Sequence, residues 1–190
     1  MKKNLLTAVW FTLVTTVIFG VIYPLIVTSL SQLFFPGRAN GQLLERNGKI
    51  VGSRIIGQTF KGPQYFHSRP SNAGTGYDPT SSSGSNLAPT NKTLIERVAG
   101  DVQTAQTDHP SEPVPIDLVT QSGSGLDPDI SRAAAEYQIA RVAQARQMSE
   151  QVVRDLVKKH TRSRDFGFLG EPRVNVLELN LDLDDSQNRK

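Results

Sequence analysis

The sequence predicts a single N-terminal transmembrane α-helix followed by one α+β domain outside the membrane, with α/β as the alternative arrangement. Residues 4–37 carry no charged side chain, which favours a membrane span. Beyond them, helical and strand patterns alternate along the chain. Residues 38–190 are enough for one hydrophobic core and too few for two to be expected.

The apolar segment is long enough to cross a bilayer. Of residues 5–30, eighteen are large apolar, aromatic or alanine. Such a helix is roughly 39 Å long, and a bilayer core needs about 30 Å, so it spans with some tilt. Lys2 and Lys3 precede it, and the positive-inside rule puts them in the cytoplasm. We therefore expect residues 1–4 inside the cell, a span at 5–30, a linker at 31–41 and an extracytoplasmic or periplasmic domain at 42–190, in the inner (plasma) membrane.

A cleaved signal peptide is the alternative interpretation of this segment. Its apolar region would run about 7–15 residues and end in small residues. Here the run is much longer, and the residues around Ser29 and Ser31 make a poor cleavage site. The sequence therefore favours an uncleaved anchor.

Small residues recur every four positions along the span. Each step of four rotates about 400° in an α-helix, so the row forms a slanted stripe that lets another helix approach closely. Pro24 leaves the carbonyl of Gly20 without its usual donor and is expected to disturb the helix there. The predicted helix-docking face consists of Ala8, Thr12, Thr16, Gly20 and Pro24, and the row continues to Thr28.

Charge excludes nucleic acid as a partner. Residues 38–190 hold 19 Lys and Arg (21 minus Lys2 and Lys3) against 18 Asp and Glu, which leaves no basic field for phosphates. The chain has no cysteine, so disulfides are excluded. Residues 100–129 form an acidic segment, which is either a solvated face or a means of attracting cations such as potassium. Its acids are Asp101, Asp108, Glu112, Asp117, Asp127 and Asp129.

Local patterns predict the elements of the domain. Residues 42–60 have the pattern of a β-hairpin with a type I′ turn at Asn47-Gly48. Residues 68–91 form a polar loop, either functional or disordered. Thr90 or Asn91 begins a helix that reaches about residue 104, and Ser131 and Ser149 cap two more. Residues 114–120 and the alternating run 174–183 are predicted strands.

Motifs of nucleotide and hydrolytic chemistry are missing. The sequence contains no phosphate-binding G-x-x-x-x-G-K-[ST], no G-x-S-x-G and no S-x-x-K. His67, His109 and His160 share no metal-ligand spacing. We therefore expect no catalytic residue, no metal site and no cofactor bound by a motif of this chain. Hydrolase activity would therefore require a Ser–His–Asp set whose members come together only in the folded chain.

The string at residues 122–131, SGSGLDPDIS, is the most distinctive of the chain. Gly123 and Gly125 permit positive φ, so successive N–H groups could form an anion-binding nest. Asp127 and Asp129 oppose an anion there and favour a cation, or cap the helix that follows. A tight turn that leads into a capped helix is the structural alternative.

An ordered set of strings resembles one known family. They are GQTF (57–60), YFHSRPS (65–71), SGSNL (83–87), VPIDLVT (114–120), the glycine-rich string at 122–131, QIARVA (138–143) and GEPRVNVLELN (170–180). In this order, and with the anchor, they resemble the C subunit of the bacterial Kdp potassium-transporting P-type ATPase over nearly the whole chain. The candidate functional loop positions are Ser68, Arg69, Pro70, Ser71, Asn86, Ser122, Gly123, Ser124, Gly125, Asp127 and Asp129.

The resemblance implies an accessory subunit without catalytic activity. Its partners would be a channel-like potassium-binding subunit, a P-type ATPase subunit that carries the phosphorylated aspartate, and the lipid bilayer. The family is described as a catalytic chaperone that raises the ATPase subunit's affinity for ATP, with ATP and potassium handled by the complex. Because ATP is cytoplasmic and the domain is expected outside, we expect an indirect effect, through different binding energies to two transport states. The alternative is a stand-alone, membrane-anchored hydrolase or binding protein.

Overall fold

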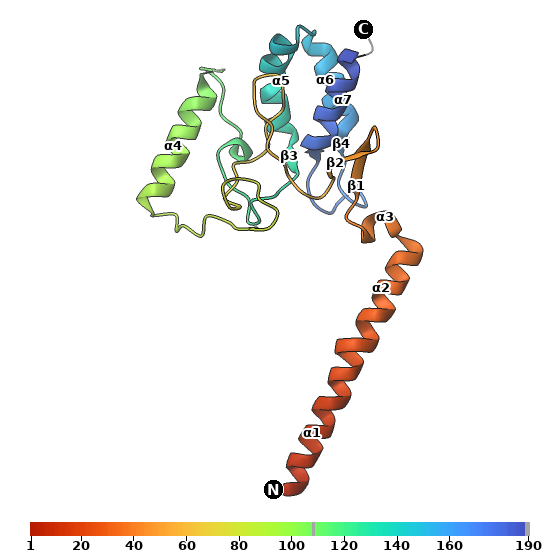
Figure 1. The fold of residues 1–190 in the computed structure, drawn as a ribbon. Helices are drawn as coiled ribbons and strands as arrows, with labels where there is room; N and C mark the ends of the chain where they lie inside the picture. The colour runs from red at the N-terminus through yellow and green to blue at the C-terminus, as the bar shows by residue number, and fades with distance from the viewer. Residues whose placement is uncertain (108, 189–190) are drawn as a thin grey trace. The chain divides into compact units, whose positions relative to one another are not determined.

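The computed structural model of the protein describes residues 1–107 and 109–188 (Figure 1). The chain divides into two compact units, Met1–Ile50 and Val51–Lys190. Asp108, one of the acids of the acidic segment, lies outside the described residues.

The first unit is dominated by a long apolar helix. It consists of α1 (Lys2–Val17), a π-helical turn η1 (Ile18–Ile22) and α2 (Tyr23–Phe34), followed by the short α3 (Pro36–Ala39). The Tyr23 N–H donates to the Ile18 carbonyl, five residues back. Pro24 has no N–H to continue the ladder, so the disturbance expected from this proline takes the form of a wider turn directly before it.

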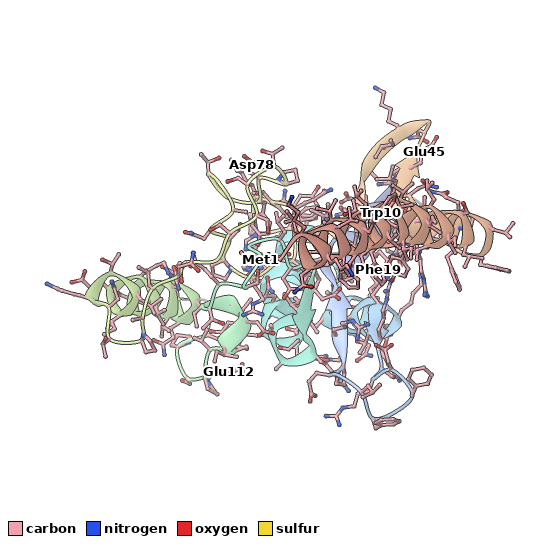
Figure 2. All side chains as sticks on the ribbon, turned by 90° about the horizontal axis from the view of Figure 1, so that it is seen from below. Met1, Trp10, Phe19, Glu45, Asp78 and Glu112 are labelled. Carbon is pink, nitrogen blue, oxygen red and sulfur yellow. The ribbon has the colours of Figure 1, made fainter. Side chains whose placement is uncertain are left out.

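This helix has the length and composition of a membrane span. Lys2–Phe34 has a mean hydropathy of 2.2, none of the most apolar stretch is buried, and no other described helix passes the same test. Trp10 and Phe19 project from it and stay more than half exposed (Figure 2). A helix with apolar residues on all sides and no covering within its own chain requires a lipid or protein environment.

The predicted hairpin is present but shorter than expected. β1 (Leu43–Arg46) and β2 (Lys49–Ser53) form a two-stranded sheet, and φ is +51° at Asn47 and +74° at Gly48, as a type I′ turn requires. The strand ends at Ser53 rather than near residue 60. There Ser53 begins a turn, accepting a hydrogen bond from the Ile56 N–H at its carbonyl and from the Ile55 N–H at its hydroxyl.

A small antiparallel sheet anchors the second unit. Its strand order is β3-β5-β4, with β3 at Asp129–Ser131, β4 at Thr161–Arg162 and β5 at Arg173–Asn175. Ile130 lies opposite Val174, and Thr161 lies opposite Val174 on the other side. Because both pairings are antiparallel, the domain is α+β, and the α/β alternative is wrong.

Three helices complete the core. α5 (Arg132–Arg146) packs on α6 (Glu150–His160), and α6 packs on α7 (Val176–Asn188). As predicted, the Ser131 hydroxyl accepts from the Ala134 N–H at 3.1 Å, and the Ser149 hydroxyl accepts from the Val152 N–H at 3.4 Å. Their buried side chains form one core cluster with those of the sheet and with Phe66, which comes from the loop before residue 68. The largest fully buried apolar residues are Phe66, Ile130, Ile139, Leu179, Leu183, Val142, Val153, Val157, Val174 and Val176.

The helix expected after residue 91 is also present. α4 (Lys92–Gln106) begins at Asn91, whose side-chain oxygen accepts from the Thr93 N–H at 2.9 Å. None of its residues is buried. Hydrogen bonds attach it to the rest of the unit, including one from the Tyr137 hydroxyl to the Ala105 carbonyl and one from Arg97 to the Val119 carbonyl.

Two predicted strands are wrong. Residues 114–120 contain the 3₁₀ turn η2 (Ile116–Leu118) instead, because Pro113 and Pro115 lack N–H donors for a ladder. Most of residues 174–183 belong to α7, and only the start pairs as β5. The residues of this run that are at most 2% exposed are Val174, Asn175, Val176, Leu179, Asn180 and Leu183. From Val176 onward they follow helical spacing.

Candidate functional site

The two groups of predicted loop residues lie against each other. Arg69 of the first loop donates from Nε to the Thr120 carbonyl at 3.2 Å and from Nη2 to the Gln121 carbonyl at 3.2 Å. Its Nη1 lies 3.3 Å from Asp127 Oδ2. Burial raises the pKa of Tyr77 to about 12, so its hydroxyl remains a donor, and it hydrogen-bonds to the Arg69 carbonyl. One guanidinium therefore joins both loops.

Ser71 and Gly125 lie where the two loops approach each other closely. The Ser71 hydroxyl donates to the Gly125 carbonyl at 2.6 Å and accepts from the Tyr77 N–H at 2.8 Å. Gly125 has φ +68°, and a Cβ there would lie 2.6 Å from the Ser83 carbonyl oxygen. Only glycine fits this position without strain.

The rest of the glycine-rich string is held by the polar loop. The Ser124 carbonyl accepts from the Ser83 N–H at 2.9 Å and from the Ser82 hydroxyl at 3.0 Å. The N–H groups of Gly125 and Leu126 donate within the string, to the Ser122 carbonyl and the Ser124 hydroxyl. They are thus used internally rather than presented as an anion-binding nest. The polar loop is tied down at these points, although its composition alone also fitted disorder.

Four of the candidate positions lie at the margins of this contact. Gly123 does not have positive φ, and a Cβ there would meet nothing within 4 Å. Asn86, farther along the polar loop, has φ +52°. Pro70 and Ser68 line a cavity between α4 and α5.

The two aspartates of the string are engaged with cationic and amide groups of the domain. Asp127 Oδ1 accepts from the Asp129 N–H at 3.1 Å. Asp129 accepts from Asn175 Nδ2 at 3.0 Å and lies 3.3 Å from Arg173 Nε. Burial raises the pKa of Asp129, although the hydrogen bond from Asn175 opposes the rise. Neither aspartate caps α5, since Ser131 does so.

The other described acids of the acidic segment also have partners. Asp101 pairs with Arg97, and Glu112 lies 3.9 Å from the His109 ring. Asp117 Oδ2 accepts from the Ser131 N–H at 2.7 Å. Within residues 1–107 and 109–188, no group of three or more His, Asp or Glu has the arrangement of a metal site. Of the described acids, Asp101, Asp127 and Asp129 are therefore paired with arginines.

The histidines take part in structural contacts. His67 Nε2 lies 3.0 Å from the Gly62 carbonyl oxygen, and the His109 ring packs on Tyr137 with centroids 4.5 Å apart. His160 Nε2 lies 2.8 Å from Asp182 Oδ2. These contacts hold loops and helix ends in place.

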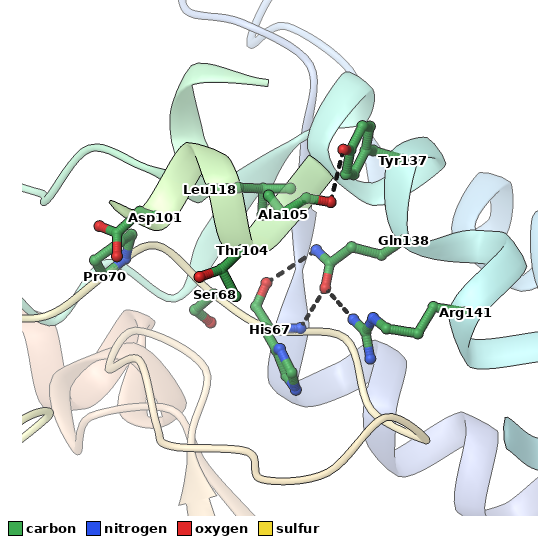
Figure 3. A pocket seen from close by; sticks show the side chains of 10 residues that line it. All are labelled: His67, Ser68, Pro70, Asp101, Thr104, Ala105, Leu118, Tyr137, Gln138 and Arg141. Carbon is green, nitrogen blue, oxygen red and sulfur yellow. Dashed lines mark hydrogen bonds between the residues drawn. The ribbon is translucent and has the colours of Figure 1, made fainter. Parts of the chain in front are cut away.

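A cavity of about 310 Å³ lies beneath α4 (Figure 3). Gln138 of α5 forms one wall, and its Oε1 accepts from the His67 N–H at 2.8 Å and from Arg141 Nη2 at 2.7 Å. Its Nε2 donates to the His67 carbonyl at 3.1 Å. Because the amide of Gln138 is already bonded within the chain, it holds the 65–71 string on α5 rather than presenting groups to a ligand.

Several residues that organise the domain were not singled out by sequence reasoning. Arg146, whose side chain is 2% exposed, lies 2.8 Å from Asp184 Oδ1 and donates to the Gln64 carbonyl at 2.6 Å. Asn175 accepts from the Glu178 N–H at 3.1 Å and so caps α7. The spacing Asn-x-x-Glu is a local signal for that cap. No local signal marks Arg146, because its partners lie far away in the sequence.

Comparison with known proteins covers nearly the whole chain. The family model described as KdpC, K+-transporting ATPase, c chain, matches residues 5–185. The chain is 58% identical to the potassium-transporting ATPase KdpC subunit of Koribacter versatilis over 187 residues, which is 98% of this chain and 97% of that protein. It is 55% identical to the KdpC subunit of Acidobacterium capsulatum, over 96% of this chain and 98% of that protein.

A stand-alone hydrolase or binding protein, the alternative that the sequence left open, does not fit a match of this extent. The chain belongs to the KdpC family, the non-catalytic C subunits of the Kdp potassium-transporting ATPase complex, and the other Kdp subunits are its partners.

Proposed function

We propose that the chain is a single-pass subunit whose N-terminus is cytoplasmic and whose unit Val51–Lys190 is extracytoplasmic. The observation that carries this proposal is the unburied apolar helix Lys2–Phe34, which begins with two lysines and contains no acid. Positive charge at a short terminal segment favours the cytoplasmic side. The domain, at the other end of the span, then lies outside.

The span docks on another membrane subunit through Ala8, Thr12, Thr16, Gly20 and Pro24. Gly20 has no steric reason within its own chain to be glycine, because a Cβ would meet only the Thr16 Cγ2 at 3.8 Å. A glycine in a helix interior is otherwise costly, so its small size is best used by a partner helix. The π-helical turn at Ile18–Ile22 lowers the rotation per residue and so reduces the drift of the stripe there.

The domain stabilises the complex and raises the ATPase subunit's affinity for ATP without contacting ATP. Support comes from the absence of a nucleotide-binding motif in the sequence and from the N–H groups of Gly125 and Leu126, which are bonded within the glycine-rich string. An effect across the membrane requires that the chain bind the ATP-competent state of the complex more tightly than the other state. The channel-like subunit and the ATPase subunit are the partners through which this preference acts, and the complex handles ATP and potassium.

Photolabelling with an azido-ATP, combined with steady-state ATPase assays, tests this function. The purified complex is compared with the same complex lacking this chain. We expect a higher ATP concentration for half-maximal activity without the chain, and label in the ATPase subunit alone when the chain is present. Label on this chain would show direct contact, and an unchanged half-saturation would remove the proposed effect on ATP.

A further inference from the structure

The turn between β4 and β5 carries an exposed aromatic pair. Phe166 is 89% exposed, more than any other large apolar side chain described in the unit Val51–Lys190, and Phe168 is 70% exposed. Leu169 beside them is also exposed. Water contact with three apolar side chains at one tip is unfavourable and marks an interaction site.

The tip, residues 165–169, is a turn closed by backbone hydrogen bonds. Asp165 and Leu169 form an antiparallel bridge, with each N–H donating to the other's carbonyl at 2.9 Å. The Gly167 N–H donates to the Arg164 carbonyl at 3.1 Å. These bonds fix residues 166–168, so the two rings are presented by a closed backbone and little further ordering is needed on binding.

Phe166 occupies a backbone conformation that suits it poorly. Its φ is +53°, in the left-handed region, where a bulky side chain is sterically disfavoured. Because the ring is exposed, the chain gains no burial of its own from placing phenylalanine there. Strain without a folding benefit points to a role in binding.

Charges around the tip are paired with one another. Arg164 Nη2 lies 2.9 and 2.8 Å from the two carboxylate oxygens of Glu171. Arg173 Nη2 lies 3.5 Å from Asp165 Oδ2, and residues 166–170 carry no charge. Two arginines therefore face two acids. An apolar tip that enters an anionic bilayer is usually helped by uncompensated Lys and Arg, whereas a neutral polar rim around aromatic anchors is the anatomy of a protein interface.

We propose that Phe166 and Phe168 are anchors that insert into an apolar pocket on another protein subunit of the Kdp complex, with the Arg164–Glu171 and Arg173–Asp165 pairs as the polar rim. The proposal depends on membership of the complex. The anchor role does not depend on the orientation of the chain or on its effect on ATP. Failure of the anchor role would therefore leave those two proposals intact, and their failure would leave the anchor role intact.

Photo-cross-linking within the assembled complex tests it. Phe168 is replaced by p-benzoylphenylalanine in the full chain, and Ile116, also 70% exposed, is the matched control position. We expect a covalent adduct between position 168 and another protein subunit, in clear excess over the adduct from position 116. An adduct with lipid alone, no adduct, or equal yields from the two positions would overturn the proposal.

A substitution experiment supplies a second measurement. In the Phe166→Ser/Phe168→Ser variant both changed side chains are exposed, so we expect an unchanged thermal midpoint of the isolated chain. Retention of the chain on an affinity-tagged ATPase subunit should fall on the order of tenfold or more, as expected for loss of aromatic hot spots. The Ile116→Ser variant should be retained like the unmodified chain. Equal retention of the two variants would contradict the anchor role.

Discussion

The side chain of Asn180 pairs with both backbone groups of Phe66. Its Oδ1 accepts from the Phe66 N–H at 2.9 Å, and its Nδ2 donates to the Phe66 carbonyl at 2.9 Å. Both residues have 0% exposure. An amide from α7 thus takes the place of a neighbouring strand for the segment that carries the buried ring of Phe66.

Replacing Asn180 should therefore lower the unfolding free energy by more than the small size of its side chain implies. The Asn180→Ala substitution leaves two buried backbone groups without partners, and we expect a loss of about 3 kcal/mol or more of unfolding free energy. Denaturant unfolding of the full chain in detergent, followed by near-UV circular dichroism, measures it. Gln103→Ala, on the exposed side of α4, is the control and should change stability by less than about 0.5 kcal/mol. Equal effects of the two substitutions would refute the role of the amide.

The glycines of the SGSG string provide a matched pair of substitutions. Gly125→Ala forces a Cβ to 2.6 Å from the Ser83 carbonyl oxygen at φ +68°, so we expect at least about 2 kcal/mol of destabilisation. Gly123→Ala adds a Cβ into open space and should be nearly neutral. The unfolding midpoints of the two variants check this. A neutral Gly125→Ala would mean that the two loops do not approach as closely as described.

Acid should weaken the contact between α6 and α7. Asp182 Oδ2 lies 2.6 Å from Lys159 Nζ and 2.8 Å from His160 Nε2. Burial acts to raise the pKa of Asp182, but the hydrogen bonds from Lys159 and His160 outweigh it and hold the pKa below its usual value of 3.8. A carboxyl with a lowered folded-state pKa stabilises fully above its unfolded value and loses that contribution as the pH falls through the folded one.

The Asp182→Asn variant isolates this effect. We expect it to unfold more easily than the unmodified chain near neutral pH, and the difference in unfolding free energy should shrink as the pH falls below 3.8. Urea titrations over a pH series measure the difference. A difference that stays constant down to the most acidic pH would exclude Asp182 as the titrating group.

The stripe on the span predicts a defect in assembly without a defect in the helix. Gly20→Leu places a large side chain where a partner helix is expected to approach, so we expect on the order of tenfold less chain to co-purify with the tagged ATPase subunit. Val21→Leu, a neighbouring change off the stripe, should co-purify normally. Membrane insertion of both variants should be unchanged, since Gly20 has no close neighbour but Thr16. Normal assembly of Gly20→Leu would exclude this face.

Local signals predicted the local structure well. The caps at Ser131 and Ser149, the Asn47-Gly48 turn and the apolar helix each depend on residues a few positions apart, and each is present. The run at 174–183 was wrongly predicted as a strand because leucines at every second position have the pattern of a strand. Asn175 and Glu178 mark the start of a helix there. Tertiary burial selects the helix, and alternation alone does not reveal it.

Local sequence patterns did not predict the polar contacts inside the domain. Gln138, Arg146 and Asn180 bond to groups 71, 82 and 114 residues away, at His67, Gln64 and Phe66. Each is a polar residue on a helix, where a solvated position is the ordinary expectation. The proximity of the 68–71 and 122–129 loops likewise depends on distant pairings such as Ser71 with Gly125.

The proposed orientation is the central claim, and labelling that shows on which side of the membrane the domain lies tests it. The chain has no cysteine, so single cysteines can be introduced at Glu112, an exposed residue of the domain, and at Lys3. A membrane-impermeant maleimide is then added to sealed spheroplasts that contain the complex. We predict that Glu112→Cys is labelled from outside and that Lys3→Cys is labelled only after permeabilisation. Labelling of Lys3→Cys from outside, with Glu112→Cys labelled only after permeabilisation, would contradict the proposed orientation.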